Sequence, residues 1–293
     1  MDGKDSRKMF SVEGMVICIT GGGTGIGKMM TEAFATHGAA KVYIVGRRKE
    51  KLDETAKLSP DVIVPVVGDV TSKDSLLDIA TQIKHDAGFV NLLCVNSGTM
   101  PPSIGLNAHE VPLREFQQKA LEQTPEDWAQ AFVTNASAIF FTSMAFLGLL
   151  DAGNSRGNAA GRQSQILVTS SIASFLRNPA TLGVYGASKA AATHLVKHMA
   201  STLVPYSIRV NALAPGLFPS ELAGPLIEKA VAEGRKPEEE GAVSKRNIPA
   251  ERLGCYRDMA GTVLYLASAA GAYVNGNVQV VDGGRLCNLP ATY

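Results

Sequence analysis

The chain has 293 residues, of which 45% are hydrophobic and 19% are charged, a balance typical of a globular protein and unlike that of a disordered chain. Its 28 basic and 27 acidic residues leave a net charge of +1 without a dense basic run, which argues against nucleic acid or an acidic membrane as a partner. The charged first ten residues lack the apolar core of a signal peptide, and the four scattered cysteines lack metal-ligand spacing. We therefore expect one cytoplasmic domain over residues 1–293 with reduced thiols and no metal site.

Seven apolar, β-branched runs predict short strands, and helical periodicity fills most of the stretches between them. The strands are expected at residues 15–20, 41–46, 62–67, 90–95, 165–170, 207–213 and 277–281. The helices are expected at residues 25–37, 72–85, 125–150 and 185–203. This alternation predicts an α/β fold: a single doubly wound Rossmann-type domain with a seven-stranded parallel sheet covered on both faces.

Single residues and connecting segments refine this fold. Pro65 lies inside the third predicted strand and cannot donate a ladder hydrogen bond, so we expect that strand at a sheet edge. Residues 151–164, rich in Gly, Asn and Ala, are expected to form a flexible surface loop. Residues 101–124 and 217–249 are long enough to be functional substrate loops, and the second contains a short predicted helix at 221–233.

A glycine-rich run follows the first strand and opens the first helix. Glycines let the backbone turn tightly and approach a pyrophosphate, and the helix N-terminus offers unpaired N–H groups to an anion. The alternative is a plain strand–helix turn, but this position favours a dinucleotide site. Its members are Gly21, Thr24, Gly25, Ile26 and Gly27.

The end of the second strand indicates which dinucleotide is bound. An NAD-binding enzyme places an acidic residue about 20 residues beyond the glycine loop, to bind the ribose hydroxyls. Here Arg47 and Arg48 follow Gly46, and arginine forms charge-assisted bonds with a 2′-phosphate, so NADP(H) is favoured over NAD(H). The alternative is that both arginines merely solvate the next helix. Asp69 and Val70, at the end of the third strand, are suited to hold the adenine, although an Asp here is also common near a helix N-cap.

Tyr185 and Lys189 are four residues apart in a predicted helix, so their side chains share one face. A nearby ammonium favours phenolate, so we expect Lys189 to lower the pKa of Tyr185. Tyr185 can then donate a proton to a carbonyl oxygen, or remove one in the reverse direction. Ser171, at the end of the fifth strand, can hydrogen-bond the same oxygen. Without the glycine loop and the parallel sheet, these residues would be interpreted as structural.

In combination, these motifs resemble the short-chain dehydrogenase/reductase family over residues 14–284. The resemblance implies that Lys189 also binds the nicotinamide ribose. It also implies that Asn135, in a helix kinked around a water, completes a proton relay from Lys189 to solvent; the alternative is an Asn at a packing interface. Further implied cofactor contacts are Asn96, Ser97, Gly98, Pro215, Gly216 and Ser220. The chain has Val95-Asn96-Ser97-Gly98 where the family usually has Asn-Asn-Ala-Gly, and Ser220 where a Thr is common.

The leading functional hypothesis is an NADP(H)-dependent oxidoreductase that reduces a ketone to a secondary alcohol, or the reverse, on a hydrophobic specialised metabolite. Apolar residues of the 101–124 and 217–249 segments favour a hydrophobic substrate, although they could equally anchor those segments to the core of the domain. The alternatives are a 3-oxoacyl-thioester reductase of lipid synthesis, a reductase of a carbon–carbon or carbon–nitrogen double bond, and a non-catalytic NADP(H)-binding sensor or scaffold.

The segment 101–124 is longer than the resemblance leads us to expect, and it is predicted to add a cap over the substrate mouth. Residues 132–150 carry no charge, and polar side chains interrupt them, so a buried helix is favoured over a membrane span. This helix and the resemblance to a family of dimers and tetramers predict a homo-dimer or homo-tetramer. The expected partner is otherwise a small carbonyl or alcohol substrate.

Overall fold

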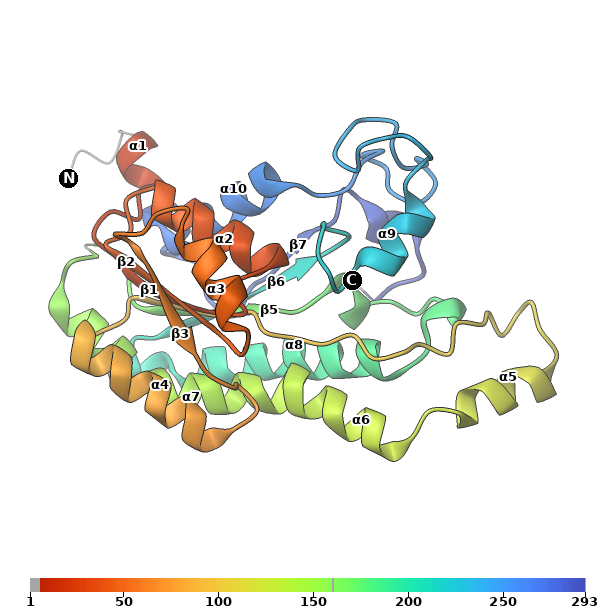
Figure 1. Cartoon of the computed structure of the whole chain (residues 1–293), viewed down its shortest axis with the longest axis horizontal. Coiled ribbons are helices and arrows are strands. Elements are labelled where there is room, and N and C mark those ends of the chain that lie inside the picture. The colour runs from red at the N-terminus through yellow and green to blue at the C-terminus, as the bar shows by residue number, and fades with distance from the viewer. Residues whose placement is uncertain (1–5, 160, 293) are drawn as a thin grey trace.

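The structure is a computed structural model that describes residues 6–159 and 161–292 (Figure 1). Its strands are β1 (Val16–Thr20), β2 (Lys41–Gly46), β3 (Ile63–Val67), β4 (Leu92–Val95), β5 (Gln165–Thr169), β6 (Arg209–Pro215) and β7 (Val278–Val281). They form one parallel sheet in the order β3-β2-β1-β4-β5-β6-β7. The predicted seven-stranded parallel sheet is confirmed, and every strand lies within two residues of its expected bounds.

Helices cover both faces of this sheet. They are α1 (Ser6–Met9), α2 (Gly25–Thr36), α3 (Lys49–Ala56), α4 (Lys73–Asp86), α5 (Leu113–Leu121), α6 (Pro125–Phe132), α7 (Ala138–Arg156), α8 (Val184–Thr202), α9 (Gly224–Ala230) and α10 (Tyr256–Ala267). Figure 1 shows α4, α7 and α8 below the sheet and α2, α3 and α10 above it. Each layer has its own apolar core, with Phe146 and Val196 in the lower one and Phe34 and Val263 in the upper one. This is the doubly wound arrangement that the sequence predicts.

The strand register brings the chemistry-bearing loops to one edge of the sheet. Thr20 pairs with Val45, and Ile19 pairs with Cys94, so the turns that follow β1, β2 and β4 leave the sheet side by side. In an open parallel sheet, ligands bind at the carboxyl ends of the strands, where neighbouring connections diverge. β3 pairs only with β2, so Pro65 lies in an edge strand, as predicted.

The stretch Pro125–Arg156 comprises α6, a π-helical turn (Val133–Ser137) and α7. It is the one candidate among the described residues that is long and apolar enough to cross a membrane. In this fold its side chains Ile139, Phe146 and Leu150 are buried in the core between α4 and α8. The prediction of a core helix is therefore confirmed for its inner face, while Phe140 and Phe141 remain exposed on the outer one.

The prediction of a surface loop over residues 151–164 is wrong for its first part, because α7 continues to Arg156 and ends at Gly157 with φ +69°. Asn154 is held by tertiary hydrogen bonds: its Nδ2 donates to Ser207 O (2.9 Å), and its Oδ1 accepts from Ser164 N (2.7 Å). Such contacts stabilise helical backbone where Gly and Asn favour turns in isolation. The predicted helix at 221–233 is confirmed as the shorter α9.

Candidate active site

The glycine loop between β1 and α2 has a backbone conformation that larger residues could not adopt. Gly21 and Gly25 have φ values of +67° and +52°, in the region that L side chains rarely adopt. A Cβ atom on Gly27 would lie 2.1 Å from the carbonyl oxygen of Gly21, so the turn closes too tightly for any larger residue. Thr24, the N-cap of α2, makes no side-chain capping bond, which leaves the first N–H groups of the helix open to an anion. This cradle fits a dinucleotide pyrophosphate.

The loop after β4 packs directly against the glycine loop. The N–H groups of Asn96 and Ser97 both donate to Thr20 Oγ1 (3.0 and 3.1 Å), and Asn96 Nδ2 donates to Thr20 O (3.1 Å). A Cβ on Gly21 would lie 3.2 Å from Ser97 Oγ, so Ser97 stands against the loop. The structure thus brings residues 96–98 to the cradle despite their departure from the Asn-Asn-Ala-Gly pattern.

Two basic residues follow β2 at the same edge. Hydrogen bonds from Thr71 N and Oγ1 to the Asp69 carboxylate lower the pKa of Asp69. The positive charge of Arg47 lowers the same pKa by a smaller amount. Arg48 is exposed, and its Nη2 donates to Glu221 Oε2 at 2.9 Å. Both arginines are therefore near the end of the cradle, but Arg48 is engaged with a residue of the 217–249 segment.

The segment after β6 lies across the cradle. Gly216 N donates to Val281 O (2.9 Å), and a Cβ on Gly216 would lie 2.8 Å from Asp282 Cβ, which fixes the turn after Pro215 against β7. Ser220 then approaches the glycine loop, where its Cβ lies 2.8 Å from the position of a Cβ on Gly25.

Tyr185 and Ser171 come together as the sequence predicts. Tyr185 lies in the first turn of α8, and Ser171 follows β5 at the start of a 3-10 turn (Ile172–Ser174). Ser171 lies close enough to Tyr185 to lower the pKa of its phenol through a side-chain interaction. A carbonyl oxygen near this pair could therefore receive hydrogen bonds from both side chains.

The prediction that Lys189 lowers the pKa of Tyr185 is wrong for this structure. Burial raises the pKa of Tyr185, and the side-chain interaction with Ser171 acts in the opposite direction. Lys189 is 3% exposed and donates from Nζ to Thr169 O at 3.0 Å. Burial lowers the pKa of Lys189 from 10.5 to about 8. Desolvation acts on both groups, and helical spacing alone did not reveal it.

Asn135 lies in the π-helical turn and is fully buried. Its Oδ1 accepts from Thr99 N (2.8 Å), and its Nδ2 donates to Thr99 O (2.9 Å) and Ser188 Oγ (3.0 Å). A Cβ on Gly98 would lie 3.2 Å from Asn135 Oδ1 and 3.3 Å from Lys189 Nζ, so both polar groups flank this glycine. A π turn stands where the resemblance implies a kink, and Asn135 and the Lys189 amine both lie next to Gly98.

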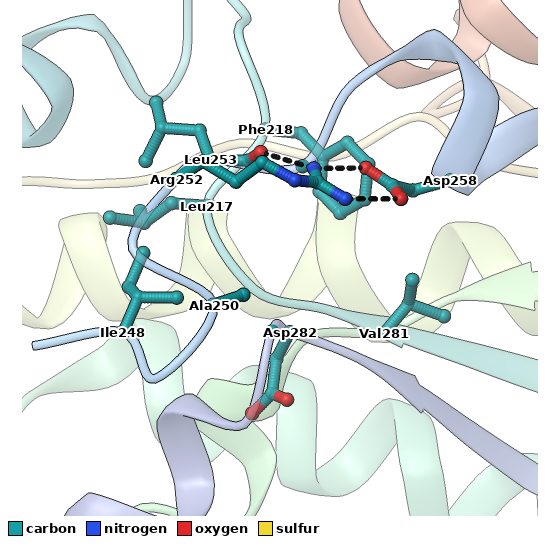
Figure 2. Close-up of a pocket in the computed structure, with 11 residues that line it drawn as sticks. Leu217, Phe218, Ile248, Ala250, Arg252, Leu253, Asp258, Val281 and Asp282 are labelled. Atoms are coloured by element: carbon teal, nitrogen blue, oxygen red, sulfur yellow. Dashed lines mark hydrogen bonds and ion pairs between the residues drawn. The ribbon is translucent and has the colours of Figure 1, made fainter. Parts of the chain in front are cut away.

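A small cavity of about 70 Å³ lies beneath the 217–249 segment, next to β7 (Figure 2). Ligand pockets are usually several hundred Å³, so this cavity is too small for a dinucleotide (about 300 Å³ or more). Its wall includes Phe218, which is 2% exposed and touches Gly254. This side chain therefore anchors the 217–249 segment to the domain, which is the alternative to a substrate contact. Figure 2 shows Arg252 and Asp258 paired through two hydrogen bonds (2.7 and 2.9 Å) at the cavity.

The C-terminal segment is a neighbour of the site that sequence reasoning missed. Arg177 N donates to Pro290 O (2.7 Å) and Thr292 N donates to Phe175 O (2.8 Å), so this segment pairs with the chain just beyond Ser171. Asn288 Nδ2 donates to the carbonyls of residues 245 and 246 (3.1 Å each) and ties it to the 217–249 segment. These are mostly backbone contacts between distant residues, and no sequence motif marks them.

The 101–124 segment approaches this site at its base, where Gln123 Nε2 would lie 3.7 Å from a Cβ on Gly183, two residues before Tyr185. Among its members only Ile104 is buried, and α5 buries no side chain. Figure 1 shows α5 projecting from the body at the lower right. At its base, Gln123 Nε2 donates to Pro102 O at 3.3 Å. The predicted cap stays a prediction.

No metal-ligating cluster of three His, Cys, Asp or Glu side chains forms in the described part of the chain. Cys18 and Cys94 are buried free thiols in β1 and β4, as expected for structural residues, and burial raises the pKa of both.

Known proteins share this sequence and fold. Residues 15–230 match the short chain dehydrogenase family. The short-chain dehydrogenase/reductase PhomF of Diaporthe leptostromiformis is 44% identical over 287 residues, which cover 97% of this chain and 96% of the relative. The 3-oxoacyl-acyl-carrier-protein reductase FabG of Thermotoga maritima is 31% identical over 276 residues, which cover 93% and 98%.

Among solved structures, the Pseudomonas aeruginosa RhlG/NADP active-site complex has a TM-score of 0.76 at 28% identity and covers 94% of this chain and 98% of its own. The family match spans most of the sheet, including the glycine loop, Ser171, Tyr185 and Lys189. The chain belongs to the short-chain dehydrogenase/reductase family and is an oxidoreductase of that family.

Proposed function

We propose that this protein uses NADP(H) to reduce a ketone to a secondary alcohol, or to catalyse the reverse reaction, on a hydrophobic specialised metabolite. The observation that carries the cofactor choice is the pair Arg47 and Arg48 at the end of β2, where an NAD-binding site would hold a carboxylate. Guanidinium groups form strong bonds with a phosphate. The NADP complex of the RhlG relative supports this choice.

The residues of the chain divide the work of the reaction. When bound, the nicotinamide supplies or accepts the hydride. The glycine loop and the N-terminus of α2 hold the pyrophosphate, Arg47 and Arg48 hold the 2′-phosphate, and Lys189 binds the nicotinamide ribose. The loop of residues 96–98, the turn at Pro215 and Gly216, and Ser220 line the cofactor, with Asp69 and Val70 beside the adenine.

Tyr185 carries the proton step in this proposal. Its hydroxyl donates a proton to the carbonyl oxygen during reduction, while Ser171 hydrogen-bonds the same oxygen and orients it. Because burial raises the pKa of Tyr185, the phenol is held protonated in this state, as a proton donor requires. Lys189 would then return a proton toward Tyr185, and Asn135, which like Lys189 lies next to Gly98, would position the relay that reprotonates Lys189 from solvent.

The test is NADPH oxidation by the purified protein against hydrophobic ketones, 3-oxoacyl thioesters and enones, with NADH as the control cofactor. Turnover of ketones with NADPH, lost in Tyr185→Phe, supports the proposal. Turnover only of enones, with the carbonyl retained in the product, contradicts it. Tight NADPH binding without turnover of any class favours a sensor or scaffold.

A 3-oxoacyl-thioester reductase is the second candidate function. The likeness to the Thermotoga maritima 3-oxoacyl-acyl-carrier-protein reductase over nearly the full length of both chains favours it. Both candidates use the same proton donor and differ only in the substrate segments. A preference for a 3-oxoacyl thioester over its parent ketone, measured as kcat/KM, would decide for this candidate.

We also propose a homo-dimer or homo-tetramer. Phe140 and Phe141 are 42% and 45% exposed on the outer face of α7, with Trp128 and Val133 exposed nearby along α6 and the π turn. Exposed aromatic side chains are enriched at protein–protein interfaces. A monomeric mass by light scattering at micromolar concentration would contradict the assembly, and Phe141→Glu is expected to reduce the mass of the assembled protein.

A further inference from the structure

The segment that follows β6 contacts two parts of the cofactor cradle with consecutive residues. Ser220 lies against Gly25, with its Cβ 2.8 Å from the position of a Cβ on that glycine. Glu221 accepts a hydrogen bond from Arg48 at 2.9 Å. The chain at residues 220–221 therefore spans from the phosphate turn to the arginine that the proposed function assigns to the 2′-phosphate.

The two ends of the 217–249 segment are held very differently. Beyond its far end, Arg252 donates two hydrogen bonds to Asp258 and one to Leu253 O (2.9 Å), with side chains 34% and 28% exposed (Figure 2). This pairing lowers the pKa of Asp258 to about 2. At the near end, Arg48 and Glu221 share one hydrogen bond, with side chains 51% and 58% exposed. An exposed single contact is weak and exchanges easily, whereas a bidentate pair persists.

We propose that Glu221 is a specificity-determining residue that competes with the 2′-phosphate of NADP(H) for Arg48. This inference rests on the proposed function, because it assumes that Arg48 binds the phosphate. A phosphate carries more negative charge than a carboxylate and offers three acceptor oxygens, so it displaces Glu221. NAD(H) has a hydroxyl at this position and leaves the Arg48–Glu221 pair intact.

Displacement has a consequence for the substrate side of the molecule. Once Arg48 turns to the phosphate, residues 220–221 lose the ion pair that holds them across the cradle, while the Arg252–Asp258 anchor remains. Occupation of the phosphate site and release of this end of the segment are then coupled, and linkage requires the coupling to act in both directions. Removing the carboxylate must therefore strengthen phosphate binding.

The experiment measures the dissociation constants of NADPH, NADH, adenosine 2′,5′-bisphosphate and 5′-AMP for the wild type and Glu221→Gln by calorimetry. We expect Glu221→Gln to bind NADPH and the bisphosphate about two- to fivefold more tightly, which is the range of an exposed ion pair. The affinities for NADH and 5′-AMP should not change. Glu228→Gln is the matched control: it makes the same charge change in α9, and Glu228 has no ion pair within the described residues.

Arg48→Ala distinguishes competition for Arg48 from a long-range effect of the Glu221 charge on the bound cofactor. In this background Glu221→Gln should no longer change the ratio of NADPH to NADH affinity, because the contested group is gone. A gain that persists without Arg48, or one that Glu228→Gln reproduces, overturns the inference. So does an unchanged ratio in Glu221→Gln when the wild type prefers NADPH. A wild type that binds the bisphosphate no better than 5′-AMP would instead contradict the proposed cofactor.

Discussion

The carboxyl edge of the sheet and the helices α5 and α9 of the 101–124 and 217–249 segments are built in contrasting ways. At the edge, Asn135, Ser188 and Lys189 are at most 3% exposed, and each bonds to backbone or to another buried side chain. In the segments, α5 and α9 bury no side chain, and Leu113 is 80% exposed (Figure 1). Buried, hydrogen-bonded groups have few alternatives, whereas exposed segments change without disturbing them. This contrast separates a buried edge that tolerates little variation from two exposed helices that can vary.

The largest expected effect is on Tyr185, the proposed proton donor. Tyr185→Phe removes one hydroxyl from the buried edge, and we expect kcat to fall by about 100- to 10,000-fold, the usual contribution of a general acid. NADPH affinity should remain near that of the wild type. The control is Tyr206→Phe, which removes the hydroxyl of a side chain that is 60% exposed. If Tyr185→Phe retained its turnover, the assignment of the proton step to Tyr185 would be contradicted.

Lys189 should give this edge a pH-dependent stability. Its pKa is about 8 when folded and 10.5 ordinarily, so between these values the unfolded chain holds a proton that the folded protein has released. The free energy of unfolding therefore rises with pH in this window, and the penalty for burying the charged form applies below it. Relative to Lys189→Met, the wild type should gain about 2 kcal/mol between about pH 7 and pH 9.5.

Urea unfolding at the two pH values measures this gain. Lys197→Met, at an exposed position on the same helix, controls for the loss of a lysine side chain from α8. A stability difference between the wild type and Lys189→Met that is the same at both pH values would contradict the burial of the ammonium.

The glycine loop should tolerate a methyl group far less well than a helix surface does. Gly27→Ala places a Cβ 2.1 Å from Gly21 O, so the loop must shift, and we expect a loss of about 1–3 kcal/mol in stability together with weaker NADPH binding. Gly148→Ala in α7 meets nothing within 4 Å and should instead stabilise the protein by up to about 1 kcal/mol. Urea midpoints and NADPH titration measure both variants, and equal effects would weaken the contrast.

The smallest effect is expected where the C-terminal segment is bonded to the 217–249 segment. Asn288→Ala removes two hydrogen bonds to residues 245 and 246, each worth about 0.5–1.5 kcal/mol or less at an exposed site. We expect tryptic cleavage after Lys245 and Arg246 to accelerate about two- to fivefold, with little change in global stability. Asn107→Ala, whose side chain bonds only within the 101–124 segment, should leave these cleavages unchanged. Global destabilisation by Asn288→Ala would show that the C-terminal segment belongs to the rigid part.

Sequence by itself determined the sheet, its seven strands, the edge position of Pro65 and the turn that requires Gly21, Gly25 and Gly27. These features follow from hydrophobic periodicity and local sterics, which act within a few residues. It also predicted that Ser171, at the carboxyl end of β5, would serve the same oxygen as Tyr185 at the start of α8.

Only the tertiary structure decided the features that join distant residues. The raised pKa of Tyr185 and the lowered pKa of Lys189 come from burial among several elements. The pairing of Arg48 with Glu221, 173 positions along the chain, has no local pattern. The same holds for the C-terminal segment beside Ser171 and for the continuation of α7. Desolvation and long-range pairing depend on which surfaces the fold brings together, and no short window of sequence contains that information.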